Sequence, residues 1–227
     1  MASILLSAGI PEYASEDTPM QRHEIVEATV AATRAVLGSG AQLVFGGHPL
    51  ITPVVFTVAA EQLGDHAERD RVVLFQSDFF ADVLPTEVWN FRSAPWASVR
   101  DIGAKRARED DSTYEFERKR RSALADMRDA MVSSLETPIG AVFIGGKTGI
   151  VDEYERVLGL AQRLERPVPC YPIGLPGGRA AELSPRYMHN AELESELRQS
   201  GAYHHLLRKV VADMIEAQED RERPLDR

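Results

Sequence analysis

The sequence predicts an α/β protein with three layers, in which a mainly parallel sheet is covered by helices on both faces. Short apolar runs alternate with longer segments of helical periodicity along most of the chain, and this alternation is typical of parallel sheets with helical crossovers. The expected strands are continuous apolar runs, which indicates that both of their faces are buried. A strand followed by a double glycine occurs three times, at Gly46-Gly47, Gly145-Gly146 and Gly177-Gly178.

The individual elements follow from apolar spacing and from residues that end helices. From about Thr18 to Leu37 apolar residues recur three and four positions apart, and Gly38-Ser39-Gly40 closes that helix. Pro53 fits a helix over 51–63 if it lies in the first turn, where its missing N–H costs nothing. The expected strands are 3–7, 42–45, 71–76, 141–144 and 168–173, and the expected helices are 18–37, 51–63, 112–134, 151–164, 191–199 and 203–218.

The composition is that of one globular domain. The chain has 227 residues, of which 44% are hydrophobic, and this is enough to bury a sizeable core. We expect a single domain over 1–218, with its core at 3–181 and C-terminal helices at 189–218, and a charged tail at 219–227. The lone cysteine, Cys170, argues against disulfides and thiolate metal clusters. With no apolar run long enough to span a membrane and no basic, apolar leader, we expect a cytoplasmic protein.

The net charge of −9 argues against general nucleic-acid binding, which depends on a basic face. Small charged ligands remain compatible with it, because they respond to the local field. The basic run 118–121 reads as a solvated helix face, whereas Arg128 is flanked by Met127 and Met131 and is the arginine expected to point toward the sheet edge. No His-x-x-x-His or Cys-x-x-Cys pair indicates a metal site, and we expect no cofactor.

The segment 141–154 carries the strongest sign of a ligand. An apolar strand runs into Gly145-Gly146, and Lys147-Thr148 then leads into a helix that carries Glu153 one to two turns later. A helix N-terminus presents unpaired N–H groups and a partial positive charge, so a glycine turn before it suits an anion such as phosphate. An acid at Glu153 is placed to address a ribose hydroxyl. The alternative is an ordinary turn that needs glycine only for its backbone angles.

Several glycine turns are expected at the same edge of the sheet. Ser7-Ala8-Gly9, Gly46-Gly47 and Gly177-Gly178 each follow a predicted strand, and ligands of parallel sheets bind beyond the carboxyl ends of the strands. Together they favour a phosphate-bearing ligand. A relaxed Walker A match at 141–148 does not indicate an ATPase, because residues 142–144, which would wrap the phosphates, read as strand.

Two features leave alternatives open. His48 either touches a phosphate or a base, or it is a turn histidine that faces solvent. The irregular segment after residue 76 is rich in aromatic residues, which either form a base-stacking wall or fill a satellite core or a dimer interface. These aromatic residues are Phe79, Phe80, Trp89, Phe91 and Trp96.

The two main glycine segments, 43–49 and 143–150 with Glu153, resemble the signatures of the SLOG superfamily. Ser7-Ala8-Gly9 and Tyr171-Pro172-Ile173 with Gly177-Gly178 fit the same pattern, so the similarity spans Ile4 to about Ala181. The resemblance implies a Rossmann-like, LOG-like fold and is closest to the branch found beside effector modules in bacterial defence and stress systems. The ligand-binding residues that it implies are Ser7, Gly9, Gly46, Gly47, His48, Gly145, Gly146, Lys147, Thr148, Gly149, Gly177 and Gly178.

The same resemblance leaves two functions open. One is a sensor of an ADP-ribose-like or other nucleotide-derived ligand, and the other is a LOG-type N-glycosidase in which Arg128 and Glu153 are catalytic. The enzymes have proline where this chain has Ile144, a Gly-Thr order where it has Thr148-Gly149, and an acid one position away from Glu153. The resemblance also implies a homodimer, and a sensor requires an effector protein as its partner.

Overall fold

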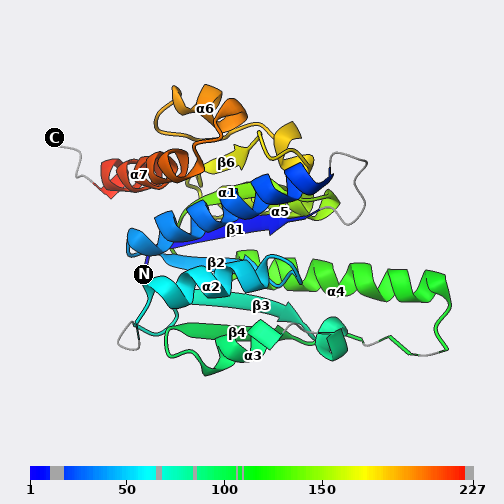
Figure 1. Ribbon diagram of the computed structural model, residues 1–227. Coiled ribbons are helices and arrows are strands. Elements are labelled where there is room, and N and C mark those ends of the chain that lie inside the picture. Colours follow the sequence, from blue (N-terminus) through cyan, green and yellow to red (C-terminus); the bar gives the residue numbers. More distant parts are fainter. Residues whose placement is uncertain (11–17, 65–67, 84–85, 106, 109, 223–227) are drawn as a thin grey trace.

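In the computed structural model, the described part of the chain forms one sheet of six parallel strands in the order β4-β3-β2-β1-β5-β6 (Figure 1). The model describes residues 1–10, 18–64, 68–83, 86–105, 107–108 and 110–222. The strands are β1 (Ser3–Gly9), β2 (Gln42–Gly46), β3 (Val72–Ser77), β4 (Ala97–Ile102), β5 (Pro138–Gly145) and β6 (Cys170–Ile173). The predicted α/β class with a parallel sheet is therefore confirmed.

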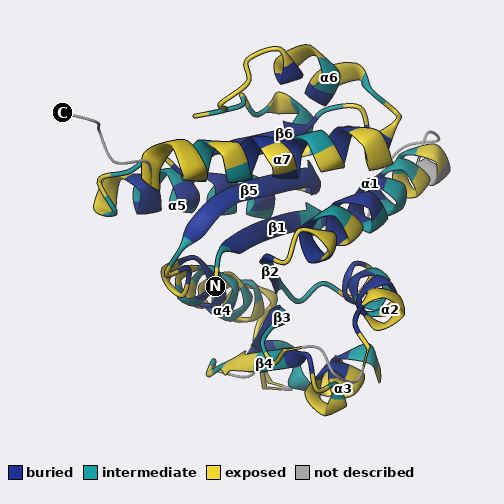
Figure 2. Ribbon diagram, turned by 90° about the vertical axis from the view of Figure 1, so that its left-hand side faces the viewer, coloured by how far each residue is buried: buried dark blue, intermediate teal, exposed yellow. Residues whose placement is uncertain are grey.

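Helices cover both faces of this sheet, as the apolar strands require. Those packed on one face are α1 (Thr18–Gly38), α2 (Thr52–Gln62), α3 (Thr86–Ser93), α6 (Leu193–Gln199) and α7 (Tyr203–Glu222). The other face carries α4 (Thr113–Ser133) and α5 (Thr148–Arg163). Figure 2 shows α1 and α2 across the sheet from α4 and α5. Two short 3-10 helices, η1 (Asp78–Val83) and η2 (Arg179–Glu182), complete the described elements.

The chain changes its winding direction between β1 and β5. The first four strands build outward from β1 to β4, and α4 then crosses back so that β5 pairs on the other side of β1. The helix after β1 lies on one face and the helix after β5 lies on the other. Rossmann-like folds bind their ligands at such a switch point, beyond the carboxyl ends of the strands, and we call this position between β1 and β5 the crevice.

The segment after β3 is more regular than the sequence suggested. It contains η1, α3 and the edge strand β4, which pairs with β3 from Val72↔Ala97 to Ser77↔Ile102. Half of the β4 residues are partly or fully exposed polar or charged residues, so the apolar signal of a strand is weak there. An edge strand has only one neighbour, and its sequence is correspondingly less apolar.

Most of the aromatic residues in this segment belong to the core. Phe91 and Trp96 are buried, and Phe91 packs against Phe45 and Phe56 with ring centroids 5.8 and 5.0 Å apart. Phe80 is half-buried, and Trp89 has 58% of its surface exposed. The core interpretation of Phe91 and Trp96 is therefore confirmed.

The C-terminal helices complete one face of the molecule. α7 packs on α1 and continues to Glu222, beyond the expected end at 218. The part of the expected tail at 223–227 lies outside the described residues. No helix in the described part of the chain combines the length and the apolar character needed to cross a membrane.

Candidate functional site

Three glycine turns meet beyond the carboxyl ends of β1, β5 and β6. The Gly146 N–H donates to Gly9 O at 2.6 Å, and the Arg179 N–H donates to Gly146 O at 3.0 Å. Gly145, Gly146 and Gly178 have φ values of +64°, +67° and +68°, which side chains other than glycine rarely adopt. A Cβ on Gly178 would lie 2.5 Å from the Gly145 carbonyl carbon. These backbones approach each other so closely that only glycine fits.

The turn after β2 lies on the same rim. The Gly47 N–H donates to Phe75 O at 2.7 Å, and a Cβ on Gly47 would overlap the Gln76 side chain. The His48 ring reaches toward β1, with Cδ2 3.9 Å from the position of a Cβ on Gly9. The His48 Nδ1 accepts a hydrogen bond from the Leu50 N–H at 3.2 Å. His48 is therefore a half-buried turn residue next to the crevice, and its contact with a ligand stays a prediction.

Helix α5 starts at this rim and points its positive end into the crevice. It begins at Thr148, directly after the Gly145-Gly146 turn, and no side chain caps its N-terminus. Lys147 and Thr148 are exposed at that end. An N-terminus of this kind leaves backbone N–H groups available to an anion.

Arg128 of α4 joins this N-terminal turn to two acids of α5. Its Nε donates to Glu153 Oε1 at 3.1 Å, and its Nη1 donates to Asp152 Oδ2 at 3.2 Å. The Arg128 and Glu153 side chains are only 17% and 13% exposed. The guanidinium also lies against Gly149, where a Cβ would overlap Nη2. The structure thus brings Arg128, Glu153 and the glycine turn together, and their roles toward a ligand stay predictions.

The buried environment of the Glu153 carboxyl disfavours its ionised form. Burial raises the pKa of this carboxyl, while the Arg128 charge, Ser7 and the hydrogen bond from Arg128 act in the opposite direction. The Ser7 hydroxyl is buried at the end of β1 and has no partner in hydrogen-bonding geometry among the described residues. A buried, unsatisfied hydroxyl beside a carboxylate is a group that a ligand hydroxyl could pair with.

Two residues of this site carried no clear signal in the sequence. Asp152 and Glu153 both form ion pairs with Arg128. Asp152 also forms an ion pair with Arg156, with Oδ1 3.4 Å from Nε. The i,i+4 spacing of Asp152 and Arg156 was the one feature of the sequence that indicated this network. Gln21 of α1 lies against Gly177, where a Cβ would be 2.7 Å from Nε2. Gly177, with φ +75°, therefore contacts the start of α1 rather than the α5 side. No group of three or more potential metal ligands gathers among the residues that the structure describes.

Comparisons with known proteins identify the family of this chain. A model of the SLOG cluster3 family matches residues 13–211, and this match supports a nucleotide-related domain. An X-ray structure of TM1055, a structural genomics target, is similar with a TM-score of 0.48 and 15% identity over 81% of each chain. No curated protein matches this sequence. Because the family model covers most of the chain, the protein belongs to the SLOG cluster3 family.

Proposed function

We propose that this protein binds a nucleotide-derived ligand of the ADP-ribose type in the β1–β5 crevice and serves as a sensor in a bacterial defence or stress system. The observation that carries the proposal is the contact of Arg128 with Gly149 at the uncapped start of α5. A guanidinium, a helix N-terminus and a side-chain-free turn at one point form an anion site.

The remaining groups suit the sugar of such a ligand. Glu153 presents a carboxylate one turn beyond the glycine turn, and Ser7 presents a buried hydroxyl on the neighbouring strand. Carboxylates accept hydrogen bonds from ribose hydroxyls, as the acidic residue of dinucleotide-binding folds does. Phosphate near Gly146 therefore places the ribose over Glu153.

A second function, cleavage of an N-glycosidic bond, is favoured by one specific observation. The buried Glu153 has a raised pKa and a direct arginine partner, which is typical of acids with a chemical role. In this reaction, water adds to the anomeric carbon as the bond to the base breaks, and the base leaves with a proton. The Glu153 carboxylate would stabilise the oxocarbenium-like charge, and Arg128 would hold the phosphate.

One experiment separates the two functions. The protein is titrated with ADP-ribose, AMP and NAD by calorimetry, and the same mixtures are analysed by chromatography for released base. Binding without release supports the sensor, whereas release that is lost in Glu153→Gln supports the enzyme. Glu155→Gln is the matched control, because Glu155 is exposed on the same helix. Absence of both binding and release refutes the proposal.

The expected homodimer and effector partner stay predictions. Sedimentation velocity with and without ADP-ribose measures whether the protein pairs and whether the ligand changes that pairing.

A further inference from the structure

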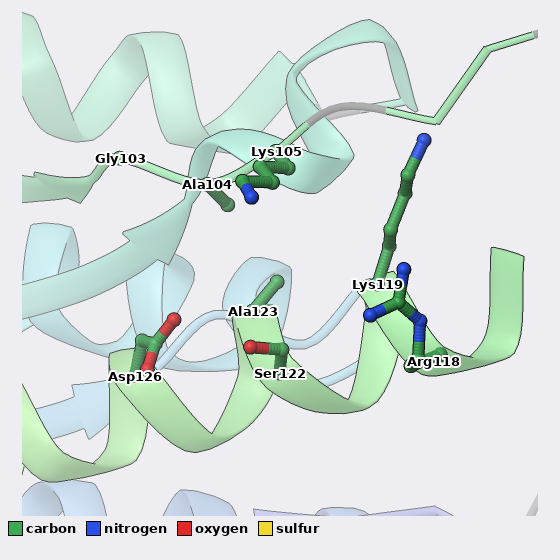
Figure 3. A pocket seen from close by; sticks show the side chains of 8 residues that line it. All are labelled: Gly103, Ala104, Lys105, Arg118, Lys119, Ser122, Ala123 and Asp126. Carbon is green, nitrogen blue, oxygen red and sulfur yellow. The ribbon is translucent and has the colours of Figure 1, made fainter. Parts of the chain in front are cut away.

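A pocket of about 590 Å³ lies outside the crevice, between the segment after β4 and helix α4. Gly103, Ala104 and Lys105 line one side, and residues of α4 line the other (Figure 3). Its size is within the range of small-molecule sites. The α4 residues that line it are Arg118, Lys119, Ser122, Ala123 and Asp126.

The pocket lining carries more positive than negative charge, with three cations, Lys105, Arg118 and Lys119, and one acid, Asp126. Within the described part of the chain, neither Lys105 nor Arg118 forms an ion pair, whereas Lys119 Nζ is held 2.7 Å from both oxygens of Asp111. Lys105 and Arg118 approach from opposite sides of the pocket (Figure 3). Two unpaired cations across a concave surface favour an anionic group between them.

The other lining groups suit a sugar rather than an apolar ligand. Ser122 offers a hydroxyl, and Asp126, one turn further along α4, offers a carboxylate that accepts hydrogen bonds from sugar hydroxyls. Ala104 and Ala123 supply small apolar surfaces between these polar groups. The lining therefore fits a ribose phosphate better than it fits a hydrophobic molecule.

Helix α4 connects this pocket to the crevice. Ala123 lines the pocket, and one turn later Met127 lies against Gly46, with Cε 3.1 Å from the position of a Cβ on that glycine. Arg118 in the pocket and Arg128 in the crevice are separated by ten residues, which span about 15 Å of helix. The N-terminal half of α4 projects past the carboxyl ends of the strands, so both sites open on the same rim (Figure 1).

We infer that this pocket is a second phosphate-binding subsite, and that the ligand is a nucleotide derivative with two separated phosphate-bearing parts, such as a dinucleotide that carries one phosphate on each nucleotide. This inference rests on the proposed function, because it assigns the first part to the crevice. The phosphate and ribose of one half bind at Gly146, Arg128 and Glu153. The other half extends past Gly46 and binds between Lys105 and Arg118. A mononucleotide is too short to occupy both places.

The test compares a short and a long ligand on matched variants. Dissociation constants of AMP, ADP-ribose and the 5′-phosphorylated dinucleotide pApA are measured for the wild-type protein and for Lys105→Ala/Arg118→Ala. The control Arg121→Ala/Arg163→Ala removes two exposed arginines outside the pocket and so changes the net charge equally. The expected result is at least a tenfold loss of pApA affinity in the pocket variant, with unchanged AMP affinity and no effect in the control.

Equal effects of the pocket variant on AMP and pApA, or none on either, overturn the inference. If the wild-type protein binds none of the three nucleotides, the proposed function fails, and a titration with inorganic pyrophosphate then tests the pocket by itself. Pyrophosphate binding that is lost only in Lys105→Ala/Arg118→Ala supports an anion site there. Binding that is equal in all three proteins, or absent from the wild-type protein, refutes it.

Discussion

The substitution Gly149→Ala is expected to displace the Arg128 side chain while the protein still folds. A Cβ on Gly149 would overlap Arg128 Nη2 and lie 3.2 Å from Cζ. Gly149 has an ordinary helical backbone at the start of α5, so alanine is not strained there. The guanidinium is the far end of a flexible side chain, and we expect it to move away from Glu153 and Asp152.

The magnitude follows from the contacts that move. Alanine in place of glycine in a helix stabilises by up to about 1 kcal/mol. The displaced Arg128 loses two charge-assisted hydrogen bonds, of about 1.5–3 kcal/mol each when nothing replaces them, but Asp152 is 40% exposed and water takes over there. We therefore expect a net destabilisation of about 1–2 kcal/mol, or a Tm lower by about 2–8 °C for a chain of this size.

The effect on ligand binding is larger than the effect on stability. Loss of one charge-assisted contact of about 1.5–3 kcal/mol weakens ADP-ribose or AMP binding by about 10- to 150-fold. Thermal melting by circular dichroism and calorimetric titration measure the two effects.

The matched control is Gly159→Ala in the same helix. A Cβ there has only Arg163 Nη1 nearby, at 3.9 Å, and we expect a Tm higher by about 2–4 °C with unchanged binding. Wild-type affinity in Gly149→Ala, together with the expected loss of stability from the broken ion pair, would refute the role given to Arg128 in ligand binding.

Three further predictions address the core and the buried groups. Burial raises the pKa of the Cys170 thiol to about 12, so we expect no alkylation of the native protein near pH 8 by iodoacetamide and rapid reaction after denaturation. Phe91→Ala should destabilise by about 3–5 kcal/mol in urea unfolding, whereas Trp89→Ala should change stability by less than about 1 kcal/mol; equal effects would contradict the packing. The raised pKa of Glu153 means that its contribution to stability is present below the ordinary carboxyl pKa and is lost as pH rises through the folded-state pKa. The Tm of Glu153→Gln relative to wild type should therefore rise as pH increases above the ordinary carboxyl pKa, while exposed Glu155→Gln shows no such trend.

The sequence by itself determined the alternation of strands and helices, the parallel class of the sheet and the place of the glycine turns. These features are local or periodic: buried strands are continuous apolar runs, and the helices over 18–37 and 112–134 are long enough for their spacing to be unambiguous. Arg128 and Glu153 were singled out from the resemblance to a known family, and the structure places them in contact with each other.

Only the tertiary structure decided which residues meet across the chain. The strand at 97–102 is identified by its pairing with β3, because half of its own residues are polar or charged. The contacts of Arg128 with Asp152 and of Gly177 with Gln21 join separate elements, and no local spacing encodes them. The pocket between Lys105 and Arg118 likewise depends on how α4 crosses the sheet edge. A chain's periodicity determines its elements, whereas the contacts between elements depend on how those elements pack in three dimensions.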